Sequence, residues 1–223
     1  MRNKTYLCLD KQEMKGMKRL FLILATVIAL AACGNNTVPV TAEKGAIETI
    51  MNRKSVRSFT GEKLTEDQLT TLLKAAMAAP TAGNSQPWQF LVVTDDAKSG
   101  IPGADRGDAI KTAGAVIIVC GETTQSRTPR NNPDAAPEIV PNGFWYEDCS
   151  AAAENLLLAA EALDLGAVWL SCYPNEGKCA AVKAAFGLPE NVEPLAIIPV
   201  GVPAGDDQPK DKWKPEKIHN NRW

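Results

Sequence analysis

The sequence predicts an α+β fold, with helices and strands arranged in layers around a buried core. Predicted helices and strands alternate irregularly along the chain, which disfavours a regular doubly wound parallel sheet. The chain has 223 residues, 45% apolar and 22% charged, and is long enough to bury a sizeable core in one domain or two small ones. Its 24 basic and 26 acidic residues give a formal net charge of −2. This composition excludes a disordered tail, a collagen-like fibre and a polybasic nucleic-acid binder.

Residues 1–32 are predicted to be a signal peptide rather than part of the fold. An unbroken apolar run, residues 20–32, follows closely on three basic side chains. This pattern is typical of a secretory signal, and the run is too short for a membrane-spanning helix. The run ends in Leu-Ala-Ala-Cys-Gly, which resembles the bacterial lipobox and predicts lipidation of Cys33. The alternative is a buried N-terminal helix in which Cys33 is an ordinary core residue.

The segment that follows predicts how the domain is attached. Residues 33–42 are mostly small and polar, and we expect them to form a flexible tether in front of a folded domain at residues 43–223. A lipid on Cys33 would anchor this domain to a membrane of the bacterial cell envelope without spanning it. If the lipobox interpretation fails, a cytoplasmic location is the alternative.

The spacing of apolar residues predicts the elements in order. Helical spacing marks residues 43–51 and 65–79, and the second of these begins with a Thr65–Gln68 capping box and stops at Pro80. The other predicted elements are strands at 89–94, 115–120, 167–170 and 195–202, the last interrupted by Pro199, and helices at 144–163 and 176–186. Residues 122–142 contain four prolines and little periodicity, which predicts a long functional or mobile loop.

Cysteine and histidine usage limits the chemistry. Cys120 lies in an apolar run and is expected to be a buried thiol. Cys172 and Cys179 are close enough to form a disulfide, which export would allow, but their spacing leaves the pairing open. A single histidine and the absence of a CxxC motif predict no metal site and no nucleophilic catalytic pair.

Three segments carry polar groups suited to a ligand. Residues 53–57 (RKSVR) offer three cations and a hydroxyl that can hold a phosphate, or they form a solvated basic turn. Residues 80–88 offer a hydroxyl, amides and free N–H groups, or they form a simple helix-to-strand connection. Residues 173–177 begin a helix whose first N–H groups can bind a ring nitrogen, or they form an ordinary cap.

These segments in this order resemble the nitroreductase family of FMN-dependent oxidoreductases. The shared features are Arg-x-Ser-x-Arg, a capped helix, Pro-Thr-Ala-Gly-Asn-Ser-Gln-Pro-Trp, Pro-x-Glu-Gly and a basic tail. The resemblance runs from about residue 47 to the C-terminus. It implies an α-β-α sandwich that forms an obligate homodimer, with two FMN sites at the interface.

The resemblance assigns FMN contacts to four groups of residues. Those expected at the phosphate, the ribityl chain and the pyrimidine edge are Arg53, Ser55 and Arg57. Those expected to reach the flavin from the other subunit are Pro80, Thr81, Ala82 and Asn84. Those expected along the ring, with the N–H of Glu176 or Gly177 facing flavin N5, are Pro174, Asn175, Glu176 and Gly177. The tail cations expected at the phosphate are Lys210 and Lys212.

Two features depart from the family pattern. The family's Asn and Lys after the second strand have no clear counterpart in residues 101–111, where Arg106 or Lys111 can substitute. The loop at 122–142 matches no subgroup signature, although such loops roof the substrate channel. Phe144, Trp145 and Tyr146 offer either a stacking wall for a substrate or ordinary core.

The resemblance implies a ping-pong oxidoreductase without a catalytic side chain. Electrons would pass from NAD(P)H or a membrane redox partner to a nitroaromatic, a quinone or a similar small acceptor. An exported location makes NAD(P)H scarce, so location and donor constrain each other. Two alternatives stay open: a flavin-dependent dehalogenase or flavin-cleaving enzyme on the same fold, and a non-catalytic binding lipoprotein.

Overall fold

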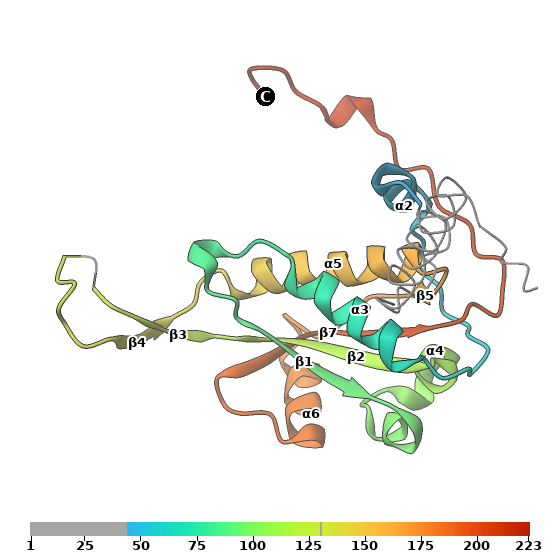
Figure 1. Cartoon of the computed structure of the whole chain (residues 1–223), viewed down its shortest axis with the longest axis horizontal. Coiled ribbons are helices and arrows are strands. Elements are labelled where there is room, and N and C mark those ends of the chain that lie inside the picture. The colour runs from blue at the N-terminus through green and yellow to red at the C-terminus, as the bar shows by residue number, and fades with distance from the viewer. Residues whose placement is uncertain (1–43, 130) are drawn as a thin grey trace, which may run out of the picture. The chain divides into compact units, whose positions relative to one another are not determined.

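The computed structural model describes residues 44–129 and 131–223, and its centre is a five-stranded antiparallel sheet (Figure 1). In spatial order the strands are β1 (Trp88–Val93), β2 (Ala115–Glu122), β7 (Val192–Gly201) and, on the outer edge of β7, the short β5 (Gly166–Ala167) and β6 (Leu170–Ser171). The predicted signal peptide, Cys33 and the tether lie outside the described residues.

Helices cover both faces of the sheet (Figure 1). One face carries α3 (Glu66–Met77) and α5 (Trp145–Ala162), and the other carries α4 (Asp108–Thr112) and α6 (Glu176–Phe186). The short α2 (Ala46–Asn52) contacts α5. The predicted α+β layer structure is therefore confirmed, and none of the described helices is both long and apolar enough to cross a membrane.

The position of β2 at the centre of the sheet explains why its sequence is continuously apolar. Ile117 and Val119 face the core beneath α3 and α5, whereas Val116 and Ile118 face the core beneath α4 and α6. Both faces are buried, so the two-residue alternation of a half-exposed strand is absent. The predicted strand at 115–120 is confirmed, and it extends to Glu122.

The capping box of α3 forms as predicted. The Gln68 N–H donates to Thr65 Oγ1 (3.1 Å), and the Thr65 N–H donates to Gln68 Oε1 (2.9 Å). The helices predicted at 144–163 and 176–186 are confirmed as α5 and α6.

Pro199 acts differently from the prediction. It does not interrupt β7, which runs through it in register with Val116 of β2. The carbonyl of Pro199 accepts from the Val168 N–H (3.2 Å) on the side of β5 and β6. In an antiparallel pair the N–H and C=O of one residue face the same neighbouring strand. The N–H that Pro199 lacks would therefore point to β5 and β6, so proline weakens the pairing on that side and leaves the pairing with β2 intact. The strand predicted at 167–170 is accordingly split into β5 and β6.

The predicted long loop contains a hairpin. β3 (Thr124–Arg127) pairs with β4 (Glu138–Pro141), and Figure 1 shows this ribbon projecting beyond the sheet. The predicted loop at 122–142 therefore includes two short strands that the sequence did not indicate, because neither face of the ribbon packs on the core and no apolar alternation marks its strands.

The four described cysteines are free, buried thiols: Cys120, Cys149, Cys172 and Cys179. The possible pairing of Cys172 with Cys179 is therefore not formed. Burial raises the pKa of Cys120, Cys149 and Cys179 to about 12, and that of Cys172 to about 11. These thiols pack as apolar groups and have little thiolate character at neutral pH.

Candidate functional site

The Arg53–Arg57 segment leaves α2 as an extended strand-like stretch beside β5. The Val56 N–H donates to the Ala167 carbonyl (3.0 Å), and Ser55 forms a parallel bridge with Ala167. The Val56 side chain is buried against Gly166, where an added Cβ would lie 2.6 Å from the Val56 Cβ. Glycine at 166 therefore allows the segment to pack directly on the sheet edge.

Two cations of this segment pair with α5, and one does not. Arg53 Nε lies 3.7 Å from Glu154 Oε1, and Lys54 Nζ lies 3.1 Å from Glu161 Oε2. Arg57 is exposed and donates only to the Ser55 carbonyl (3.4 Å), with no ion pair to a described residue. Its guanidinium is therefore available to an anionic ligand.

The start of α6 presents free backbone donors. Asn175 caps the helix, since its Oδ1 accepts from the Lys178 N–H (2.9 Å), so the capping interpretation holds for this side chain. The first-turn N–H groups of Glu176 and Gly177 have no acceptor within the described part of the chain. Both residues and Pro174 are exposed.

A cavity of about 530 Å³ lies against this helix start. Its lining residues are Pro102, Gly103, Ile110, Leu170, Ser171, Cys172, Asn175, Gly177, Lys178, Ala181, Val182 and Ile197. The lining is largely apolar, and its one charged member among the described side chains is Lys178, which the sequence analysis missed. Lys111 lies instead at a separate hollow with Asp95 and Asp105. The side chain of Arg106 is outside the described part.

A buried carboxylate shapes the Pro80–Asn84 turn. Asp148, in the first turn of α5, accepts from the Ala82 N–H (3.0 Å) and from Ser85 Oγ (3.1 Å). Two residues of the turn take positive φ, Gly83 (60°) and Asn84 (56°), and so does Gln86 (50°) just after it. Asp148 was not anticipated from the sequence, because its partners Ala82 and Ser85 lie more than sixty residues away along the chain.

The structure brings two of the predicted groups to one sheet edge. Ser55 meets β5 at Ala167, and the Pro174–Gly177 segment follows β6. Ala167 and Ser171 pair with β7 residues four positions apart, so the groups are separated by roughly 13 Å along the edge.

The Pro80–Asn84 turn lies elsewhere in the same chain. It is fixed to Asp148, whereas Arg53 and Lys54 are held by Glu154 and Glu161, six and thirteen residues further along α5. These separations are roughly 9 and 20 Å of helix. One copy of the chain therefore does not place this turn beside the Arg53–Arg57 segment.

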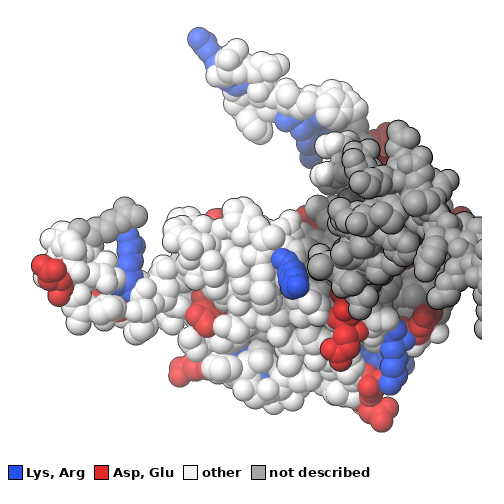
Figure 2. Space-filling view, viewed as in Figure 1, with Lys and Arg blue, Asp and Glu red and all other residues white. Residues whose placement is uncertain are grey.

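The predicted tail cations are exposed. Lys210 and Lys212 follow β7 on an extended tail, where they make no ion pair with a described residue. Figure 2 shows basic side chains along this tail.

The aromatic residues at the start of α5 divide between core and surface. Trp145 is buried, and its ring meets the Tyr173 ring edge-on at 4.9 Å. Tyr146 stacks on Tyr173 at 5.9 Å, and both rings are partly exposed beside Pro174. The core interpretation therefore fits Trp145 only, and Tyr173 joins the exposed aromatic surface.

No group of three or more histidine, cysteine, aspartate or glutamate side chains in residues 44–129 and 131–223 is arranged to hold a metal ion. The polar groups on the sheet edge instead suit an organic anion. Arg53 and Arg57, the first amides of α6 and the apolar cavity can together bind a phosphorylated heterocycle.

Known proteins resemble this chain in sequence and in fold. Residues 50–202 match the model of the nitroreductase family. A protein of Archaeoglobus fulgidus named "Putative NADH dehydrogenase/NAD(P)H nitroreductase" is 34% identical over 79% of this chain and 98% of its own length. A crystal structure from Bacteroides thetaiotaomicron with the same name is 38% identical, with a TM-score of 0.68 over 81% of this chain and 99% of that one. A Desulfovibrio desulfuricans structure in complex with FMN is 27% identical, with a TM-score of 0.65 over 82% and 99%.

Proposed function

This chain belongs to the nitroreductase family, and from that premise we propose that it transfers electrons from NAD(P)H to a small oxidised acceptor, such as a nitroaromatic or a quinone. FMN is the cofactor of this oxidoreductase. When bound, FMN supplies the redox chemistry by taking up and releasing two electrons. The observation that carries the proposal is a single sheet edge that combines three features: Arg57 and the first α6 amides, which have no ionic partner or acceptor among residues 44–129 and 131–223, and the apolar cavity.

The residues at this edge fit the chemistry of FMN. Arg53 and Arg57 supply charge for the phosphate or the pyrimidine edge, and the Ser55 hydroxyl can bond to the ribityl chain. The N–H groups of Glu176 and Gly177 can donate to a ring nitrogen. Apolar side chains of the cavity exclude water from the ring.

The reaction needs no acidic, basic or nucleophilic side chain at the reacting atoms. The described thiols are buried with raised pKa values, which excludes them as nucleophiles at neutral pH. The contribution of the protein is to orient and polarise its cofactor, and donor and acceptor use one open site in turn. This order predicts ping-pong kinetics.

A homodimer completes the proposed site. The Pro80–Asn84 turn is held by Asp148, roughly 9 to 20 Å of α5 from the carboxylates that pair with Arg53 and Lys54 of its own chain, and a second copy can supply this turn to the site. The apolar face of α2 supports this pairing, because Ile47, Ile50 and Met51 are 73%, 51% and 71% exposed. An exposed apolar face of this kind is typical of a protein interface.

The function is tested by following the visible flavin spectrum under anaerobic conditions. Protein purified with FMN is expected to bleach on adding NADH or NADPH and to regain colour on adding a quinone or a nitroaromatic. A protein that stays colourless after incubation with FMN would overturn the proposal in favour of a non-catalytic binding lipoprotein. Turnover of iodinated phenols, or destruction of reduced flavin, would identify the dehalogenase or flavin-cleaving alternative.

We also propose that the domain is held on the outside of a bacterial membrane through a lipid on Cys33. The support is the apolar run at 20–32 with its lipobox-like end. Labelled palmitate should appear in the membrane-bound wild type and be absent from Cys33→Ala. If the wild type stays unlabelled in the soluble fraction, the lipoprotein proposal fails, and the flavin chemistry is unaffected.

A further inference from the structure

We propose that Glu161 is a positioning residue for FMN binding: its buried carboxylate holds Lys54 and so fixes the direction in which Ser55 and Arg57 are presented. The inference rests on the proposed function, and of the two places that this function allows for Arg57 it takes the phosphate. Glu161 itself does not contact the ligand.

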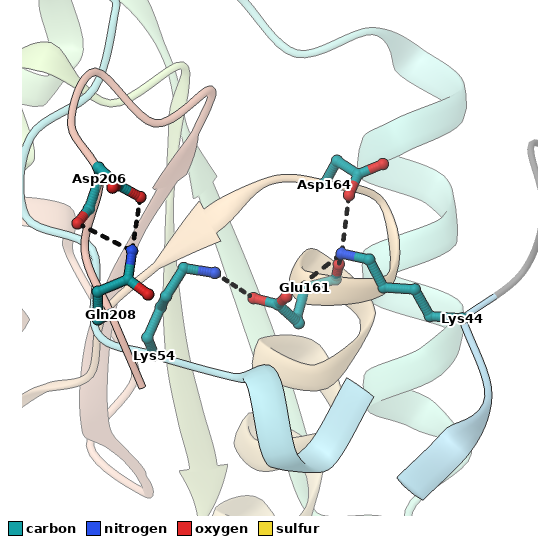
Figure 3. Close-up of polar contacts among 6 residues, drawn as sticks. All are labelled: Lys44, Lys54, Glu161, Asp164, Asp206 and Gln208. Atoms are coloured by element: carbon teal, nitrogen blue, oxygen red, sulfur yellow. Dashed lines mark hydrogen bonds and ion pairs between the residues drawn. The ribbon is translucent and has the colours of Figure 1, made fainter. Parts of the chain in front are cut away.

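Glu161 is buried but doubly paired (Figure 3). It lies in the last turn of α5 and is 7% exposed. Its Oε2 accepts from Lys54 Nζ (3.1 Å), and its Oε1 accepts from Lys44 Nζ (3.3 Å). Lys44 also reaches Asp164 Oδ1 (2.7 Å) and the Glu161 carbonyl (2.9 Å). Each oxygen of the carboxylate therefore has its own cation.

This pairing constrains Lys54 more than a surface ion pair would. A buried carboxylate that loses a cationic partner keeps its desolvation penalty, so the native state strongly favours Lys54 in this position. The Lys54 side chain is 26% exposed, which leaves its ammonium directed inward to α5 rather than free for a ligand.

The direction of Lys54 sets the direction of its neighbours. Successive side chains of an extended segment point to opposite sides. Arg53 pairs with Glu154 and Lys54 with Glu161, and these partners lie seven residues, roughly 10 Å, apart along α5. Lys54 and buried Val56 form the anchored row, which leaves Ser55 and Arg57 in the opposite row, whereas Arg53 is held to α5 by its own ion pair.

The inference is tested by comparing FMN with riboflavin, which has the same ring and no phosphate. We expect Lys54→Met and Glu161→Gln each to raise the Kd of FMN by about tenfold or more, as loss of a supporting residue commonly does. The Kd of riboflavin should change little. Lys54→Arg, which can keep the ion pair, should stay near the wild-type value for both ligands.

Lys183→Met is the matched control. Lys183 pairs with Glu193 at the same 3.1 Å, and its side chain has the same 26% exposure. It lies on α6 away from the Arg53–Arg57 segment, so its loss should leave the ratio of the two Kd values unchanged.

Several outcomes would overturn the inference. Equal weakening of FMN and riboflavin would mean that the ion pair only stabilises the fold. A weaker affinity for FMN in Lys54→Met but not in Glu161→Gln would mean that Lys54 binds the phosphate directly. If Glu161→Gln does not fold, the milder Glu161→Asp can be combined with Lys54→Met. Additive effects of the two changes on the Kd of FMN would then show that Lys54 and Glu161 act independently, which would contradict the inference. A wild type without flavin binding would refute the proposed function itself, whereas unchanged Kd values in the variants would refute only the role of Glu161.

Discussion

Arg57 is the cation of the Arg53–Arg57 segment that has no ionic partner among the described residues. Arg57→Ala should weaken FMN retention, and it should also lower the reduction potential of bound FMN if the guanidinium lies at the pyrimidine edge, where it stabilises negative charge on the reduced ring. Spectroelectrochemical titration and equilibrium dialysis measure the two effects. Arg127→Ala, which removes an exposed arginine from β3, is the control. An unchanged potential and an unchanged affinity in Arg57→Ala would reject the role.

Asp148 supports the Pro80–Asn84 turn from inside the fold. Asp148→Ala leaves the Ala82 N–H and the Ser85 hydroxyl without their acceptor, which should cost about 1–3 kcal/mol in the free energy of unfolding. Urea denaturation measures this cost, and Asp134→Ala, at an exposed position, should change it little. Equal stability of the two variants would show that the turn holds its shape without the carboxylate.

The buried thiols predict a loss of stability in alkaline solution. Folding raises the pKa of Cys120 from 9.0 to about 12, so between these values the unfolded chain releases a proton that the native chain keeps. Stability is therefore complete below about pH 9 and falls as pH rises, by up to about 1.4 kcal/mol per pH unit for each such thiol. Urea unfolding at a series of pH values should show a shallower decline for Cys120→Ala. A slope identical to that of the wild type would contradict the assignment.

At the scale of elements, prediction succeeded where burial leaves a pattern in the sequence. β2 is apolar on both faces because helices cover both, and α3 carries its own capping signal. The hairpin of β3 and β4 lacks a buried face, so no pattern marks it. The same reason explains the missed site residues: Asp148 and Lys178 gain their partners and cavity only through tertiary contacts.

The hairpin lies outside both cores and should be dispensable for folding. Ser126 pairs with Ile139, so replacing residues 127–138 by Asn-Gly closes the ribbon with a two-residue turn. We expect little change in Tm and in FMN affinity, and a change in the KM of the acceptor if the hairpin roofs the substrate channel. Thermal denaturation and steady-state kinetics measure these effects. Loss of folding would show that the hairpin supports the core, and an unchanged KM for every acceptor would refute the roofing role.

At the scale of the whole molecule, the proposed homodimer divides the site between two copies, which predicts that dimerisation and FMN binding are lost together. Ile47→Glu places a charge on the exposed apolar face of α2 and is expected to give a monomer without bound FMN. Ile139→Glu is a close control, because Ile139 on β4 is equally exposed at 73% and lies away from α2. Light scattering coupled to size exclusion, read with flavin absorbance, distinguishes the outcomes. A monomeric Ile47→Glu that keeps its flavin would show that one chain holds FMN alone, and the shared site would then be rejected.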